Sequence, residues 1–167
     1  RLFKDQIGDV LRNKELLRLD GGIFSLHLCL TAVFIAVPIS LQNHLNMPGS
    51  DHWVVYLTVI FTSFFAMVPF IIIGEKKNKM KSVFLFAILL LCAASFSFSW
   101  SQFSFLFFWF SLFLFFMAFN LLEASLPSLV SKISPAGNKG TAMGIYSTSQ
   151  FFGAFVGGVL GGYVVSN

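Results

Sequence analysis

Charged side chains are scarce in this sequence. Only 11% of its 167 residues are charged, whereas 56% are hydrophobic, and the mean hydropathy is +0.81. In soluble domains about a quarter of the residues are charged. The composition therefore excludes a soluble globular protein and indicates an integral membrane protein.

The short motifs of enzymes and of ATP-driven pumps are also missing. The sequence has no GxxxxGK[ST] loop, no HExxH and no CxxC, and its two cysteines, Cys29 and Cys92, lie in apolar runs that favour a packing role. The ionisable groups inside apolar segments are Glu123 and His27, which lie on different segments. We therefore predict that the chain is not an enzyme and has no metal or organic cofactor.

Apolar stretches long enough to cross a hydrocarbon core of about 30 Å as helices recur along the chain. They are residues 21–41, 53–73, 83–100, 103–130 and 141–165. Residues 1–20 are charged and amphipathic, with Ile7, Val10, Leu11 and Leu17 at helical spacing. We predict an all-α integral membrane protein with five transmembrane helices, preceded by a cytoplasmic amphipathic linker on the membrane surface.

The distribution of positive charge predicts the orientation. All 11 Lys and Arg residues fall in residues 1–18, 76–81 and 132–139. With five alternating spans these segments lie on one side of the membrane, which the positive-inside rule assigns to the cytoplasm. Acids and bases are mixed in residues 1–20, so we expect the lipid bilayer, and not a nucleic acid, as a partner.

Glycines recur at helical spacing in the uncharged stretch 140–163. They include Gly144, Gly153, Gly157, Gly158, Gly161 and Gly162. Such spacing lets two helices approach closely in a membrane, so a generic packing face is one interpretation. The same run resembles the antiporter motif of the major facilitator superfamily, except that Gly158 stands where the family has proline. That motif marks the fifth span of the family and recurs in degraded form in the eleventh, so the resemblance implies the eleventh span.

The cationic turn over residues 74–81 carries a weaker resemblance to the same superfamily. Gly74 matches the first glycine of its signature between spans two and three. Asn78, Lys79 and Lys81 stand where the family has aspartate, arginine and glycine. This pattern is typical of the degenerate second copy, between spans eight and nine. A plain positively charged cytoplasmic loop is the alternative.

The resemblance is most specific over residues 120–162, where it points to drug:proton antiporters, and it extends over nearly the whole chain. It implies half of a twelve-helix bundle with spans seven to eleven, whose partners would be the N-terminal half and the twelfth span of the same protein. Placement in an N-terminal half is the alternative. The implied activity is secondary active transport of a small amphipathic molecule across the bacterial inner membrane by alternating access and proton-coupled efflux. The competing hypothesis is a non-transporting membrane scaffold or channel-like subunit.

Glu123 is the main candidate functional residue, since a carboxylate in hydrocarbon is costly unless it is paired or protonated. Asn120 lies one turn before it on the same helix face. Counting back from residue 130 places Glu123 about 10 Å from the cytoplasmic end, shallower than the midplane at which such transporters bind substrate. We predict a latch at the cytoplasmic gate through a lysine, while a proton-titrating carboxylate and a snorkelling side chain are the alternatives. The candidate partners are Lys76, Lys77, Lys79, Lys132 and Lys139.

Three further polar residues inside the predicted spans are candidates for lining a translocation cavity. They are His27, Tyr146 and Gln150. Hydrogen bonds between packed helices are the alternative role for each of them.

Overall fold

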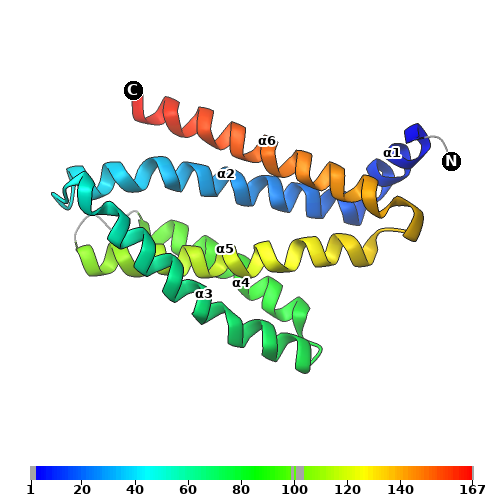
Figure 1. Ribbon diagram of the computed structural model, residues 1–167, viewed down its shortest axis with the longest axis horizontal. Helices are drawn as coiled ribbons and strands as arrows, with labels where there is room; N and C mark the ends of the chain where they lie inside the picture. The colour runs from blue at the N-terminus through cyan, green and yellow to red at the C-terminus, as the bar shows by residue number, and fades with distance from the viewer. Residues whose placement is uncertain (1–2, 99, 101–103, 167) are drawn as a thin grey trace. The chain divides into compact units, whose positions relative to one another are not determined.

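A computed structural model describes residues 3–98, 100 and 104–166, and these residues are helical with short connections (Figure 1). The helices are α1 (Phe3–Arg12), α2 (Lys14–Asn43), α3 (His52–Lys76), α4 (Met80–Ser97), α5 (Phe105–Ile133) and α6 (Lys139–Ser166), with 3-10 turns η1 (Gly49–Asp51) and η3 (Ala136–Asn138). The chain folds as two compact units, one of Arg1–Ala36 with Glu123–Asn167 and one of Val37–Leu122. We call them the terminal unit and the central unit.

Five helices of the described part are long and apolar enough to cross a membrane, which confirms the predicted all-α membrane class. The expected spans 21–41, 53–73 and 141–165 lie inside α2, α3 and α6. The expected linker 1–20 includes α1 and the first turns of α2. Residues 99 and 101–103, at which one expected span ends and the next begins, lie outside the described residues.

Within the terminal unit, α6 lies alongside α2 (Figure 1). A Cβ built on Gly153 would overlap the carbonyl oxygen of Phe24, and one built on Gly157 would overlap that of Leu28. A Cβ on Gly161 would come within 2.8 Å of Ile35 Cδ1. Later residues of α6 contact later residues of α2, so the two helices run parallel, and their backbones are in contact at Gly153 and Gly157.

Local polar contacts fix the N-terminal part of the terminal unit. The side chain of Asn13 caps α2, because its Oδ1 accepts hydrogen bonds from the backbone N–H of Glu15 at 3.0 Å and of Leu16 at 3.4 Å. Gln6 of α1 donates to the carbonyl of Gly137 at 3.4 Å and accepts from the hydroxyl of Thr141 at 3.2 Å. The amphipathic helix α1 is thereby attached to the start of α6.

The central unit contains the α3–α4 hairpin and the first part of α5. At the hairpin, Asn78 has a φ of 51°, and a Cβ on Gly74 would come within 2.7 Å of Met80 Sδ. The rings of Phe70 and Phe86 stack across the two helices with centroids 5.3 Å apart. The left-handed conformation of Asn78 lets the chain reverse tightly, and Gly74 allows the second helix to approach the first.

Polar side chains also join α3 to α5 inside the central unit. Trp109 donates a hydrogen bond from Nε1 to the hydroxyl of Thr58 at 3.0 Å, and Asn120 donates from Nδ2 to the hydroxyl of Ser63 at 3.4 Å. Ser63 is fully buried. These bonds satisfy groups that would otherwise be costly in an apolar environment.

Candidate functional site

A polar cluster lies among α2, α5 and α6 of the terminal unit, with Gln150 at its centre. The amide nitrogen of Gln150 donates to Glu123 Oε1 at 3.2 Å and lies 2.9 Å from Nε2 of His27. His27 Nε2 and Glu123 Oε2 are 3.9 Å apart. A residue from each of three helices therefore meets in one place.

The hydrogen-bond geometry assigns roles to these atoms. An amide nitrogen carries two hydrogens and only donates, so one hydrogen points to Glu123 and the other to His27. His27 Nε2 accepts that hydrogen when the imidazole carries its own hydrogen on Nδ1, so the role of the ring depends on its tautomer. Gln150 thereby links a carboxylate and an imidazole from two other helices.

Close packing of α6 on α2 brings Gln150 to His27. Gln150 lies three residues before Gly153, and His27 lies three residues after Phe24, the residue that Gly153 contacts. Because no side chain separates the helices at the glycines, a short amide side chain can bridge them. The glycine face therefore positions this polar site in addition to packing two helices.

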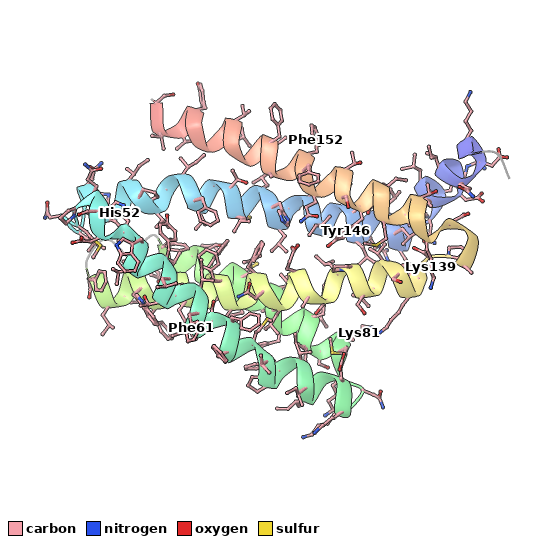
Figure 2. The ribbon with its side chains drawn as sticks, viewed as in Figure 1. His52, Phe61, Lys81, Lys139, Tyr146 and Phe152 are labelled. Atoms are coloured by element: carbon pink, nitrogen blue, oxygen red, sulfur yellow. The ribbon has the colours of Figure 1, made fainter. Side chains whose placement is uncertain are left out.

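Two more polar residues of the terminal unit face the same region. Tyr146 is only 3% exposed and lies one turn before Gln150 on α6, on the side toward α2 (Figure 2). Asp20 is 6% exposed and lies two turns before His27 on α2.

Asp20 is not among the site residues predicted from the sequence, because it is the last residue of the predicted linker 1–20. The spacing offered a signal: residues seven apart on a helix share a face, and Asp20 and His27 have that separation. Since α2 begins at Lys14, both belong to one continuous helix.

The helix bounds give the distance of the cluster from the ends of its helices. Helix α5 ends at Ile133, ten residues after Glu123, which corresponds to about 15 Å along the axis. Gln150 lies eleven residues after the start of α6 and His27 thirteen after the start of α2, or about 16 and 20 Å.

Other predicted site residues lie elsewhere. Asn120 belongs to the central unit and bonds to Ser63, while Lys76 and Lys79 are exposed at the α3–α4 hairpin of that unit. Among the described residues of the terminal unit, neither Lys132 nor Lys139 makes an ion pair with Glu123. A latch between Glu123 and Lys76 or Lys79 stays a prediction.

The six glycines of the motif fall into two groups, those that lie close to α2 and those without a close neighbour. Gly153, Gly157 and Gly161 contact α2, and a Cβ on Gly158 would lie 3.6 Å from Thr31 Cγ2. Around Gly144 and Gly162, no described atom lies within 4 Å of the position that a Cβ would take. The described residues also contain no group of three or more His, Cys, Asp and Glu side chains placed to hold a metal ion.

Comparison with known proteins identifies the family. The model of the Major Facilitator Superfamily matches residues 6–167. The chain belongs to the major facilitator superfamily. This is a family of transporters and not of enzymes, so the five apolar helices are transmembrane helices of a partial facilitator bundle.

Curated relatives agree with this family. The inner membrane transport protein YajR of Escherichia coli (strain K12) is 47% identical over 98% of the chain, which confirms the predicted likeness to a facilitator of the YajR type. Uncharacterized transporters of Buchnera aphidicola are 30% and 36% identical over 98% and 93% of the chain. The chain spans only 36–43% of the length of these relatives.

Proposed function

We propose that the chain forms part of a proton-coupled exporter of small amphipathic molecules that works by alternating access in a bacterial inner membrane. The superfamily and the printed name of the Escherichia coli relative support a transporter at that location. The proposal places the helices as spans seven to eleven. The N-terminal half and the twelfth span of the same protein would complete the bundle and the substrate cavity.

The observation that carries proton coupling is the bridge from Gln150 to Glu123 and His27. A carboxylate and an imidazole inside apolar transmembrane helices are costly to bury unless they are paired or protonated, so such groups are functional candidates. His27 Nε2 and Glu123 Oε2 lie 3.9 Å apart, beyond direct hydrogen-bond distance, and Gln150 contacts both side chains. We expect binding of a proton at either group to change the hydrogen bonds that Gln150 makes. Because Gln150 is on α6 and Glu123 on α5, protonation is expected to change how these helices hold together.

Orientation follows from charge in this proposal. Lys and Arg residues lie in α1 and at the N-terminus of α2, in the α3–α4 hairpin and near the α5–α6 connection, and these segments would face the cytoplasm. Lys76 and Lys79 with Asn120 would then stabilise the closed cytoplasmic side, which is the role that the sequence analysis predicts for them.

The test is proton movement in energised inverted vesicles that contain the complete protein. A panel of lipophilic cations and sugars is added while the internal pH is followed. We expect a compound-dependent collapse of the pH gradient that is lost in Glu123→Gln and kept in Glu15→Gln, a matched change at an exposed carboxylate that pairs with Arg18. Folded protein that gives no response to any compound would contradict proton-coupled export of these classes.

Variants that neutralise Lys76 or Lys79 distinguish the two roles considered for Glu123, a proton-binding site and a latch. If Glu123 acts as a latch, Lys76→Gln and Lys79→Gln should reproduce the Glu123→Gln defect. If it binds the coupling proton, these variants should keep a pH-dependent response that Glu123→Gln has lost.

A further inference from the structure

Asp20 and Tyr146 are deeply buried polar residues that the cluster around Gln150 does not use. Neither Oδ2 of Asp20 nor the hydroxyl of Tyr146 has a hydrogen-bond partner among the described residues, and the same holds for Oε2 of Glu123. A buried polar atom without a partner costs free energy unless water or a proton reaches it. Three such oxygens in one unit lower its stability, so helix packing alone does not explain their presence.

These oxygens form a row that leads from the basic end of the unit into its middle. Asp20 lies six residues after the start of α2, about 9 Å along the axis, and His27 lies about 10 Å further on. Tyr146 lies at the same level of the unit, because α6 runs parallel to α2 and Gln150, one turn after Tyr146, contacts His27, one turn after Ile23. Gln150 then joins Glu123 to His27.

The groups that face this row set its charge balance. Asp20 and His27 come from α2, Glu123 from α5, and Tyr146 and Gln150 from α6. Among the described residues, no Lys or Arg forms an ion pair with Asp20 or Glu123. His27 is the basic side chain that lies near Glu123, with Nε2 3.9 Å from Oε2.

The geometry points to Asp20 and Tyr146 as a proton relay between the basic, cytoplasmic end of the unit and Glu123. In each transfer the proton of the Asp20 carboxylic acid passes to the Tyr146 oxygen, while the Tyr146 hydroxyl proton passes to Oε2 of Glu123. Asp20 is left as a carboxylate, Glu123 becomes the acid, and the phenol is neutral before and after. A rotation of the Tyr146 side chain, or an intervening water, closes the gap on each side.

This inference rests on the proposed function, but its test needs no substrate. The complete protein is solubilised and transferred into D2O, and infrared difference spectra follow the carbonyl-stretch band of the protonated Glu123 carboxyl, assigned by its loss in Glu123→Gln. We expect Asp20→Asn and Tyr146→Phe to slow deuteration of that carboxyl by about a hundredfold, the low end of what a positioned proton-transfer group contributes. Asp20→Glu should restore the rate, and Glu15→Gln should leave it unchanged.

Several outcomes would overturn the relay. Deuteration at the wild-type rate in Tyr146→Phe would do so even if Asp20→Asn failed to fold, since removal of one hydroxyl keeps the ring and its packing. Absence of any band that depends on Glu123 would also do so. If the vesicles show proton-coupled export but the variants leave deuteration of Glu123 unaffected, only the relay is wrong. If the variants slow deuteration as expected but the vesicles show no export, only the proposed function is wrong.

Discussion

Gly157 of α6 lies so close to Leu28 of α2 that a Cβ at this glycine would come within 2.9 Å of the Leu28 Cα. The neighbouring atoms are backbone, which cannot rotate away. One turn earlier, Gly153 meets the backbone of Phe24 in the same manner. This backbone-to-backbone contact holds the helices that carry His27 and Gln150, so packing and polar site depend on each other.

Gly157→Ala should lower the free energy of unfolding by about 1–3 kcal/mol, the usual cost of overpacking, because the backbones would have to separate. Gly144→Ala is the matched control, since no described atom lies within 4 Å of its Cβ position. That variant should be neutral or slightly stabilising, because alanine favours helix. The measurement is thermal unfolding of the complete protein in detergent, and equal effects of the two variants would refute the contact.

Gly74→Ala should destabilise the α3–α4 hairpin by about 1 kcal/mol, at the lower end of overpacking effects. Its Cβ would meet Met80 Sδ at 2.7 Å and Val83 Cγ2 at 2.9 Å. Because the Met80 side chain is flexible and can be shortened, Met80→Ala should recover part of the loss when it is combined with Gly74→Ala. Thermal unfolding of both single variants and the double variant measures this coupling, and strictly additive effects would contradict it.

Asn13→Ala should cost about 1 kcal/mol of stability, because two backbone N–H groups at the start of α2 lose their acceptor. Asn13→Asp keeps the acceptor oxygen and should retain most of the stability. Limited proteolysis at the α1–α2 junction, compared between the two variants, reports on fraying of this end. Equal proteolysis of both variants would show that the cap contributes nothing measurable.

Cysteine labelling tests the orientation. Lys79→Cys and Ser50→Cys, both at exposed positions, are made in a background with Cys29 and Cys92 replaced by serine. A membrane-impermeant maleimide should label Ser50→Cys in intact cells and Lys79→Cys only in inverted vesicles, as the positive-inside rule requires. The opposite pattern would reverse the topology and place the basic end of α2 outside.

The sequence by itself determined the class, the number of membrane helices and the family. Apolar length and charge are properties of each segment, so spans such as 21–41 and 141–165 could be located without knowledge of their neighbours. The spacing of the glycines in residues 140–163 likewise indicated a helix face with close packing. The family resemblance needed no contacts, because it depends on the order of residues along the chain.

Only the tertiary structure decided which residues meet. Spacing grouped Gly144 and Gly162 with Gly153 and Gly157, but only Gly153 and Gly157 meet the backbone of α2. The cluster joins residues of α2 to residues of α5 and α6 that lie about a hundred positions later in the sequence, so no local pattern predicts it. Its members are Asp20, His27, Glu123, Tyr146 and Gln150. Which helix faces meet depends on the rotation and register of packed helices, which are set by all the side chains at the contact together.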